Sequence, residues 1–260
     1  MKMNSNTILI TGGTSGIGLE LATRLIQLGN TVIITGRDQS KLDLTKKKLP
    51  EVHTFQSDVS NPHEISKLYE NVMSQFPELN FLINNAGIMR KINIHDKEID
   101  LEDIDREIEI NLSGPVRMVK QFLPLLKKQK FAAIMNVSSG LAFIPFPISP
   151  IYCATKAGVH SFTQSLRVQL KDTSVKVFEL APPGTQTPLM SSFDASDMEG
   201  LAAMNVVKMV DVAIKALEGN RSEIRPGISN ILKIMSRVAP NFMLKQISKS
   251  IDSMLAQTRS

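Results

Sequence analysis

Three side chains near the middle of the chain have the types and the spacing that proton transfer to a carbonyl oxygen needs. Tyr152 and Lys156 stand four residues apart, so on a helix they share one face. A free phenol has a pKa of about 10, and a cation beside it favours the phenolate, by about 1.4 kcal/mol for each unit that the pKa falls. Ser139, thirteen residues before the tyrosine, offers a hydroxyl to the reacting oxygen. Alone, the Tyr–Lys spacing also fits an exposed pair on a helix; joined to Ser139 and a glycine-rich turn upstream, it predicts acid–base chemistry.

That glycine-rich turn runs from Thr11 to Gly18, between the first expected strand and a stretch of helical periodicity. A dinucleotide's pyrophosphate needs free backbone N–H groups at a helix N-terminus, with no Cβ in the way. Gly12 allows a tight turn, Gly16 allows close approach, and Gly18 lets the helix pack on the strand. The spacing T-G-x-x-x-G-x-G departs from the commonest G-x-G-x-x-G pattern, and an ordinary glycine-rich turn is the alternative interpretation. The strand before it and the helix after it favour a dinucleotide site.

The residue at the end of the second expected strand indicates which dinucleotide the site binds. Many NAD sites carry a carboxylate there for the ribose 2′-hydroxyl, whereas this chain has Arg37. A guanidinium can grip a 2′-phosphate with its planar fork, and no carboxylate repels that phosphate. Arg37 therefore predicts NADP(H) in preference to NAD(H). The alternative is that Arg37 only begins the next helix as a solvated charge, which leaves NAD(H) open.

Short β-branched runs alternate with longer amphipathic stretches along most of the chain. Near-continuous apolar strands separated by helices call for a parallel sheet buried on both faces. Right-handed crossovers make that sheet doubly wound. We therefore expect one α/β domain over residues 1–260, with a mainly parallel Rossmann sheet in a three-layer α/β/α arrangement. Expected strands cover residues 7–10, 31–35, 52–56, 81–83, 131–137 and 175–178, with a last edge strand near 224–227, and expected helices cover 17–28, 41–49, 62–76, 101–128 and 152–171.

Composition excludes several classes of protein. With 42% hydrophobic and 21% charged residues, the chain of 260 residues suits a folded globular protein and not a disordered one. The single cysteine excludes a disulfide scaffold and fits a reducing cytosol. The first residues lack an apolar secretory segment, and no run approaches the ~18 apolar residues that span a bilayer, so a cytoplasmic location is expected. The net charge of +5 lies mostly in residues 228–260, which predicts no nucleic-acid partner.

With these motifs in place, residues 6–190 resemble a short-chain dehydrogenase/reductase of the one-domain type. The resemblance implies that Tyr152 is the general acid/base and that Lys156 holds the nicotinamide ribose and lowers the pKa of Tyr152. It further implies that Ser139 orients the substrate oxygen and that Asn111 holds a water in a proton relay beyond the lysine. The matching residues are Thr11, Gly12 to Gly18, Asp58, Val59, Asn84 to Gly87, Asn111, Ser139, Tyr152, Lys156, Pro183, Gly184 and Thr187.

The resemblance also implies where the cofactor lies. Asp58 and Val59 would contact the adenine, Asn85 to Gly87 would line the adenosine side, and Thr187 would meet the carboxamide. The segments 137–143, 152–157 and 181–183 are similar to oxidoreductases associated with D-alanylation of lipoteichoic acid. The full expected set of cofactor-binding residues is Gly12, Thr14, Ser15, Gly16, Ile17, Gly18, Arg37, Asp58, Val59, Asn85, Ala86, Gly87, Tyr152, Lys156, Pro183, Gly184 and Thr187.

Other conspicuous residues are interpreted as structural or left with two interpretations. Cys153 follows the tyrosine, but one residue turns it about 100° away on a helix, so core packing is expected. The four histidines have no ligand spacing such as H-E-x-x-H, and no catalytic metal is expected. The apolar loop 143–148 either walls a pocket for an apolar carbonyl or packs under a neighbouring loop or subunit.

Two later segments have more individual features. Locally polar residues in 190–204 suggest a lid over the substrate pocket. Residues 228–260 have apolar side chains at helical spacing and five basic residues against one acidic residue. Such a basic amphipathic helix either packs on the domain or on another subunit, which we favour, or lies on an anionic membrane surface.

The sequence thus predicts an NADP(H)-dependent oxidoreductase that interconverts a carbonyl and an alcohol by hydride transfer. A small apolar ketone or aldehyde is the expected substrate, with reduction as the expected direction, and a homo-dimer or homo-tetramer is the expected assembly. One alternative is a non-catalytic protein that senses NADP(H) and regulates a partner. A second is a peripheral membrane reductase of lipid-like carbonyls.

Overall fold

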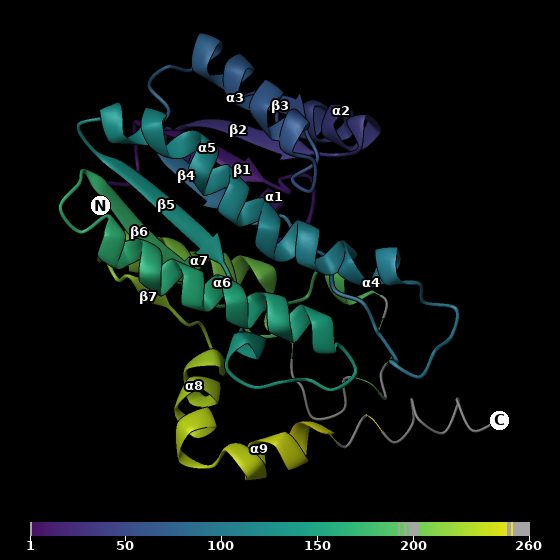
Figure 1. The fold of residues 1–260 in the computed structure, drawn as a ribbon. Helices are drawn as coiled ribbons and strands as arrows, with labels where there is room; N and C mark the ends of the chain where they lie inside the picture. The colour runs from purple at the N-terminus through teal and green to yellow at the C-terminus, as the bar shows by residue number, and fades with distance from the viewer. Residues whose placement is uncertain (1, 192, 195–196, 198–202, 249–250, 252–260) are drawn as a thin grey trace.

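Seven strands form one parallel sheet in the order β3-β2-β1-β4-β5-β6-β7 (Figure 1). The computed structural model describes residues 2–191, 193–194, 197, 203–248 and 251. The strands are β1 (Thr7–Thr11), β2 (Thr31–Gly36), β3 (His53–Gln56), β4 (Phe81–Asn84), β5 (Ala132–Val137), β6 (Val175–Leu180) and β7 (Glu223–Ile224). The main helices are α1 (Gly16–Gln27), α2 (Gln39–Lys48), α3 (Pro62–Gln75), α4 (Leu101–Ile108), α5 (Gly114–Lys128), α6 (Pro150–Gln169), α7 (Val206–Glu218), α8 (Ser229–Val238) and α9 (Pro240–Ile247).

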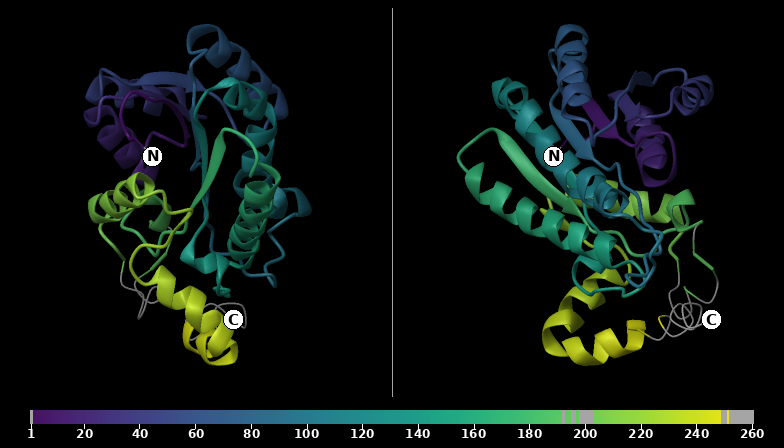
Figure 2. Two further views of the ribbon diagram at one scale, coloured as in Figure 1. Left: turned by 90° about the vertical axis from the view of Figure 1, so that its left-hand side faces the viewer. Right: turned by 45° about the vertical axis from the view of Figure 1, so that its right-hand side comes forward.

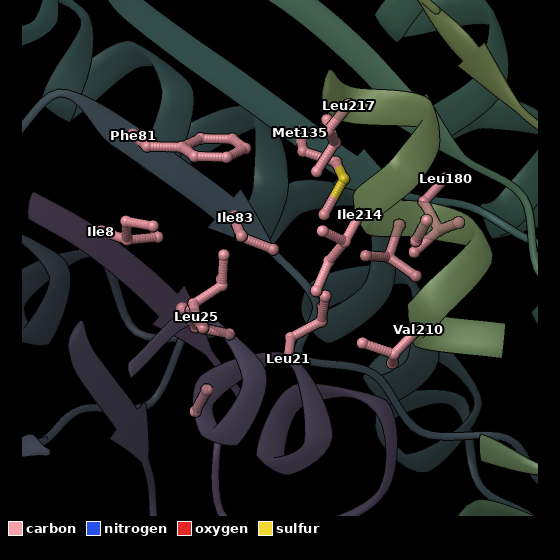
Figure 3. Packing of buried hydrophobic residues seen from close by; sticks show 14 of the residues in the cluster. Ile8, Leu21, Leu25, Phe81, Ile83, Met135, Leu180, Val210, Ile214 and Leu217 are labelled. Carbon is pink, nitrogen blue, oxygen red and sulfur yellow. The ribbon is translucent and has the colours of Figure 1, made fainter. Parts of the chain in front are cut away.

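Alternate residues of the central strands enter two separate apolar cores. In β1, Ile8 and Ile10 pack on one side of the sheet with α1 and α7, while Leu9 packs on the other side. That second core is completed by α3, α5 and α6. Figure 3 shows the first core, where Leu21 of α1 and Ile214 of α7 lie together near β4. Since both faces are buried, the expected doubly wound, three-layer Rossmann fold is confirmed.

The order in which the chain adds strands to the sheet reverses between the neighbouring strands β1 and β4. From β1 it builds outward through β2 and β3, then returns to the other side of β1 to place β4, β5, β6 and β7. A crevice opens at the carboxyl ends of strands where such a reversal occurs, and ligands bind there. The glycine-rich turn after β1 and the segment after β4 meet at this point.

Three elements differ from the sequence expectations, and the first of them, α7 (Val206–Glu218), was not expected at all. The helical stretch 101–128 is interrupted by a π-helical turn, η1 (Glu109–Ser113), between α4 and α5. The last edge strand is only two residues long, Glu223–Ile224, and it pairs in parallel with β6. Beyond it, α8 and α9 project at one end of the molecule (Figures 1 and 2).

Candidate active site

One cleft of about 420 Å³ lies along the carboxyl ends of the strands. Every expected cofactor-binding residue except Gly18 lines it, and so do Ser139, Tyr152 and Lys156. Gly18 and Asn111 instead lie behind the cleft wall, where they contact residues that form it. The fold therefore brings the residues named from the sequence together at one cleft.

The glycine-rich turn is closely packed against the chain on both sides. Gly12 has a φ of 67°, and a Cβ there would approach the Ala86 Cα to 2.8 Å. A Cβ on Gly18 would lie 2.3 Å from the Gly12 carbonyl oxygen, so the helix can start this close to the turn only with glycine. Gly13, which the motif analysis did not single out, is equally constrained, because its Cβ would lie 2.5 Å from Ile34.

The end of β4 holds this turn by hydrogen bonds. The Thr11 hydroxyl accepts from the backbone N–H groups of Asn85 and Ala86, both at 3.0 Å. The Asn85 side-chain amide donates to the Thr11 and Gly12 carbonyl oxygens, also at 3.0 Å. Asn85 thus braces the turn, in addition to lining the cleft.

The start of α1 fits a pyrophosphate. Ser15 occupies the N-cap position, yet its side chain makes no capping hydrogen bond within the described chain, and the first turn has no acidic residue. The first backbone N–H groups of a helix have no partner inside the helix, so they need an external acceptor. Gly16, with a φ of 53°, lets Thr187 approach this end closely, since a Cβ there would lie 3.1 Å from the Thr187 Cβ. The residues present therefore fit a dinucleotide phosphate.

Cations border the far end of the cleft. Arg37 is exposed there, and Lys41, four residues further on in α2, lines the same end. Among the described residues neither side chain has an ion-pair partner in the structure. Asp38 caps α2 by accepting a hydrogen bond from the Lys41 N–H at 3.1 Å. The sequence analysis did not name Lys41, which lies in the first turn of α2, whereas Arg37 precedes the N-cap of that helix.

The adenosine end also has polar atoms without partners. The Thr35 and Ser57 hydroxyls are buried, line the cleft and have no hydrogen-bond partner within the described part of the chain. Asp58, predicted to contact the adenine, accepts from the Ser60 N–H at 2.9 Å and from the Ser60 hydroxyl at 2.7 Å. The unpartnered hydroxyls of Thr35 and Ser57 can therefore still donate or accept hydrogen bonds at this end of the cleft.

Tyr152 and Lys156 share one face of α6, as the spacing predicted. The tyrosine is 6% exposed and the lysine 4% exposed. The Lys156 Nζ lies 5.5 Å from the centroid of the Tyr152 ring and donates to the Val137 carbonyl oxygen at 3.0 Å. The end of β5 thereby fixes the ammonium beside the phenol.

Burial changes the pKa of both groups. It raises the pKa of Tyr152 well above its ordinary value, while a hydrogen bond with Ser139 acts in the opposite direction. Burial also lowers the pKa of Lys156 to about 8. The sequence analysis expected the neighbouring cation to lower the pKa of the phenol; in this structure the loss of hydration outweighs that effect.

Ser139 stands where β5 ends and a short 3₁₀ turn, η2 (Gly140–Ala142), begins. It is 7% exposed, lines the cleft and caps that turn by accepting from the Leu141 N–H at 3.1 Å. A hydrogen bond with Tyr152 places the two hydroxyls together. They can therefore act on the same substrate oxygen.

Asn111 lies in the π-helical turn and is fully buried. Its side chain accepts from the Ile88 N–H at 2.9 Å and donates to the Ile88 carbonyl oxygen at 2.8 Å. A Cβ on Gly87 would lie 3.2 Å from the Asn111 Oδ1 and 3.5 Å from the Lys156 Nζ. Asn111, Gly87 and Lys156 thus meet behind the part of the cleft that Tyr152 lines, and π-helical turns occur often at functional sites.

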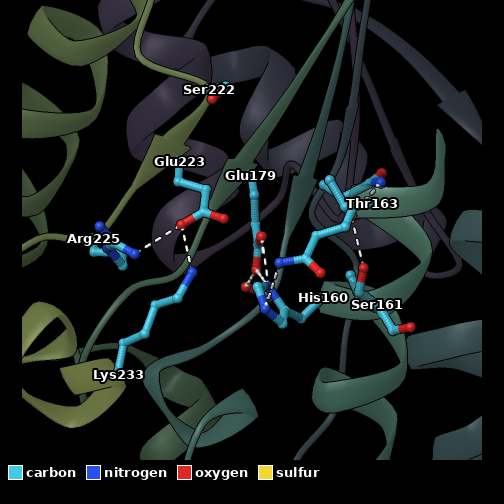
Figure 4. A network of polar contacts seen from close by, with 12 residues as sticks. His160, Ser161, Thr163, Glu179, Ser222, Glu223, Arg225 and Lys233 are labelled. Carbon is cyan, nitrogen blue, oxygen red and sulfur yellow. Dashed lines mark hydrogen bonds and ion pairs between the residues drawn. The ribbon is translucent and has the colours of Figure 1, made fainter. Parts of the chain in front are cut away.

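A polar network behind Ser139 connects β5, α6, β6, β7 and α8 (Figure 4). The buried Glu179 accepts from the Ser138 hydroxyl at 2.5 Å and contacts the His160 Nδ1 at 2.8 Å. Glu223 of β7 accepts from the Lys233 Nζ of α8 at 2.6 Å. The network fixes the residue before Ser139 and ties α8 to the sheet.

An apolar cluster surrounds Tyr152 on the substrate side. Phe146 lines the cleft, whereas Ile144 and Ile148 are buried beneath it, so the loop 143–148 provides both a wall and packing. Cys153 is 5% exposed, accepts from the Phe146 N–H at 3.2 Å, and has its pKa raised by burial to about 11. Core packing, the favoured interpretation of Cys153, agrees with this environment. The cluster also contains Met89, Leu232 and Ile247, with Leu141, Leu189, Met190 and Phe193 partly buried against it.

The predicted lid, residues 190–204, is described only in part. Residues 192, 195–196 and 198–202 of the lid, together with 249–250 and 252–260 of the basic C-terminal region, lie outside the described residues. Of the rest, Met204 forms a parallel bridge with Thr185, and the buried Asp197 pairs with the Lys91 Nζ at 2.9 Å. The lid itself stays a prediction.

Two features are absent from the described residues, a membrane-spanning helix and a cluster of metal ligands. None of the helices there is long and apolar enough to cross a membrane. Within the same part of the chain, no three His, Cys, Asp or Glu side chains gather as metal ligands would.

Known proteins share both the sequence and the fold. Residues 6–197 match the family described as short chain dehydrogenase. The chain is 46% identical over 226 residues, 86% of its own length and 89% of the relative's, to the "Uncharacterized oxidoreductase DltE" of Bacillus subtilis (strain 168). This relative confirms the expected similarity to the subset associated with D-alanylation of lipoteichoic acid.

Solved structures show the same fold. A short chain dehydrogenase from Burkholderia cenocepacia J2315 in complex with NADP has a TM-score of 0.82 and 24% identity, covering 95% of this chain and 99% of that one. A short chain dehydrogenase/reductase from Burkholderia phymatum in complex with NAD has a TM-score of 0.81 and 22% identity, covering 90% and 93%. With the family match over most of its length, the chain belongs to the short-chain dehydrogenase/reductase family and is an oxidoreductase with a nucleotide-binding Rossmann fold.

Proposed function

We propose that the protein is an NADP(H)-dependent reductase of apolar ketones or aldehydes, with Tyr152 as its general acid/base. The observation that carries this proposal is the meeting of Ser139, Tyr152 and Lys156 in one cleft with the open start of α1. A phosphate-binding helix end and an acid–base group in the same crevice are what hydride transfer to a carbonyl requires.

Each side chain has a separate task in the reaction. A nicotinamide cofactor supplies the hydride in reduction and accepts it in oxidation. Ser139 orients the carbonyl oxygen, and Tyr152, hydrogen-bonded to it, delivers a proton to that oxygen as the carbon is reduced. Lys156 binds the ribose hydroxyls and favours the phenolate that remains, and Asn111 holds the water that returns a proton.

The remaining cleft residues hold the cofactor. The turn Gly12–Gly18 and the start of α1 bind the pyrophosphate through backbone N–H groups. Asp58 and Val59 contact the adenine, the segment 85–87 lines the adenosine side, and Pro183, Gly184 and Thr187 close over the nicotinamide. Solved proteins of this fold hold NADP in one case and NAD in another, so the fold leaves both cofactors open.

The proton-transfer role is tested by Tyr152→Phe. We expect NADPH oxidation with a panel of apolar ketones and aldehydes to fall by about 10²-fold or more, while the NADPH dissociation constant changes less than about twofold. Tyr69→Phe is the matched control, since the chain has two tyrosines and this one packs on Phe122 away from the cleft. Turnover by Tyr152→Phe at the parent rate would remove the proposed role. NADPH binding without turnover by the parent would favour the alternative of a protein that senses NADP(H).

Cofactor choice is tested at the cationic end of the cleft. Arg37→Ala should raise the dissociation constant of NADPH by about 10-fold or more and that of NADH by less than about threefold. Only NADPH has a 2′-phosphate for the guanidinium to bind. Lys41→Ala should act in the same direction more weakly, since an ammonium binds phosphate as a point charge. Equal losses for the two cofactors would contradict the preference for NADP(H).

The substrate is proposed to be apolar because of the side chains around Tyr152. Met89, Leu141, Phe146 and Leu232 line this part of the cleft. Such walls favour a hydrocarbon group beside the carbonyl, and each buried methylene contributes about 0.8 kcal/mol. Within a series of aldehydes, kcat/KM should therefore rise with chain length until the pocket is filled.

The outer face of the C-terminal helices favours a second candidate, a peripheral membrane reductase. Ile231, Ile234 and Val238 of α8 are 53–75% exposed, and Phe242 of α9 is 56% exposed. Arg237 lies among them, and residues 228–251 contain no acidic residue. This face suits an anionic lipid surface better than a second copy of itself, whose cations would meet without counter-charges.

Vesicle flotation tests this candidate. The protein should float with vesicles of anionic phospholipid and not with neutral ones, and Ile231→Ser with Ile234→Ser should abolish flotation. If the protein floats no better with anionic vesicles than with neutral ones, the proposed binding to an anionic membrane surface is excluded. Light scattering of the same variants tests the homo-dimer or homo-tetramer that we propose for the cytoplasmic protein.

A further inference from the structure

One acidic side chain close to the catalytic tyrosine has no task in the reaction described above. Glu107, in the last turn of α4, is fully buried. Its Oε1 accepts from the Arg90 N–H at 2.9 Å, and its Oε2 has no hydrogen-bond partner among the described residues. The nearest cation is the Arg90 Nε, 4.0 Å from Oε2 and itself unpartnered in that part of the chain. A buried carboxylate oxygen without a hydrogen-bond partner lowers the stability of the fold, so such a group calls for a functional explanation.

Glu107 and Asn111 act together on one segment of the cleft wall. They stand four residues apart, one helical turn, and Asn111 holds both backbone groups of Ile88. Glu107 holds the backbone N–H of Arg90, two residues further on. Since Ile88 and Met89 line the cleft, the two side chains fix the wall beside the reacting groups.

The charge of Glu107 also reaches Tyr152. α4 packs against α6, the helix that carries the tyrosine. Burial is the main cause that raises the pKa of Tyr152, and the charges of Cys153 and then of Glu107 act in the same direction. Glu107 also raises the pKa of Cys153, because an anion disfavours a second negative charge nearby. Arg90 and Asp103 are the charged groups that act on Glu107 itself, and burial raises its own pKa.

We propose that Glu107 is a positioning residue, which fixes the wall segment Gly87–Arg90 and places a buried carboxylate on α4, the helix that packs against the α6 helix of Tyr152. This inference rests on the proposed role of Tyr152 as the proton donor. In reduction the donor must carry its proton, so the charge of Glu107 extends the alkaline limit of the reaction. Lys156, over the tyrosine ring, acts in the opposite direction.

Glu107→Gln separates the charge from the hydrogen bond. The amide oxygen still accepts from the Arg90 N–H, while the negative charge is lost. We expect the alkaline limb of kcat/KM for reduction to move down by about half to one pH unit, with the KM for NADPH changed less than about threefold. Glu107→Ala, which loses both functions, should also raise the KM. Asp103→Asn is the matched control, because its carboxylate pairs with the same arginine but is 40% exposed, and it should leave the limb in place.

A titration without substrate distinguishes failure of this inference from failure of the proposed function. In Tyr69→Phe protein with NADP⁺ bound, Tyr152 is the sole tyrosine and the chain has no tryptophan, so tyrosinate absorbance reports this phenol alone. Glu107→Gln should lower the pH at which the absorbance rises, whether or not a substrate has been found. If Glu107→Gln melts below the assay temperature, the paired variant Arg90→Met with Glu107→Leu removes the buried carboxylate and its half-buried partner together, and a smaller shift in the same direction is expected, because loss of the arginine charge offsets part of the effect. An unmoved titration, or an equal shift in Asp103→Asn, would overturn the proposal.

Discussion

At the scale of single residues, burial decides the charge states in the cleft. The spacing of Tyr152 and Lys156 predicts that they share a helical face, and they do. It does not show that both side chains are almost fully enclosed, because enclosure depends on β5 and on loops distant in the sequence. Loss of hydration disfavours the charged form of each group, so the pKa of the tyrosine rises and that of the lysine falls. Glu107 was missed for the same reason, since a carboxylate in an amphipathic helix is ordinarily exposed.

Lys156 gives stability a characteristic dependence on pH. Its pKa falls from 10.5 in the unfolded chain to about 8 in the fold. Between these values the unfolded chain binds a proton that the folded chain does not, so the free energy of unfolding rises with pH. In urea unfolding, the parent should gain about 2 kcal/mol between about pH 8 and pH 9.5 relative to Lys156→Met. Parallel pH profiles for the two proteins would contradict the lowered pKa, and Lys41→Met, at an exposed position, should follow the parent.

At the scale of elements, hydrophobic periodicity located the strands and the helices up to α6, but it did not predict α7. Alternation of short apolar runs with helical spacing depends only on which faces are buried, and both faces of this sheet are. The π-helical turn at Glu109–Ser113 was not predicted, because apolar periodicity over five residues does not distinguish a π-helical turn from an α-helical one. The role of Gly13 escaped as well, since its constraint comes from Ile34 on a neighbouring strand.

The packing of α1 against its turn predicts a contrast between two glycines. Gly18→Ala would place a Cβ 2.3 Å from the Gly12 carbonyl oxygen and 2.5 Å from the Asn85 amide, so the turn must move. We expect a loss of about 2–4 kcal/mol in the free energy of unfolding, together with weaker NADPH binding. Gly184→Ala, at a position with nothing within 4 Å, should change stability by less than about 0.5 kcal/mol. Chemical denaturation of both variants checks this, and equal losses would refute the close packing.

At the scale of the whole molecule, the C-terminal helices complete the substrate side of a cleft that the sheet begins. The first strands and α1 line one half of it, while Leu232 of α8 and Ile228, which precedes that helix, line the opposite wall. A Cβ on Gly140, next to Ser139, would lie 2.8 Å from the Ser229 hydroxyl, so α8 is packed directly against the turn after β5. The sequence revealed an amphipathic face in this region, but periodicity does not show which surface such a face meets.

Two adjacent residues of α8 distinguish a helix that forms part of the enzyme from one that is only appended to it. Leu232 is 7% exposed within the cluster around Tyr152, whereas Ile231 is 57% exposed on the outer face. Leu232→Ala should lower the free energy of unfolding by about 1–3 kcal/mol, less than in a closed core because the side chain borders the cleft. The same variant should shift the preference toward bulkier carbonyl substrates, since it enlarges the pocket beside Tyr152. Ile231→Ala should leave stability within about 0.5 kcal/mol of the parent and substrate preference unchanged. Chemical denaturation and kcat/KM across a substrate series measure both effects. If both variants behave like the parent, α8 does not form the wall of this pocket.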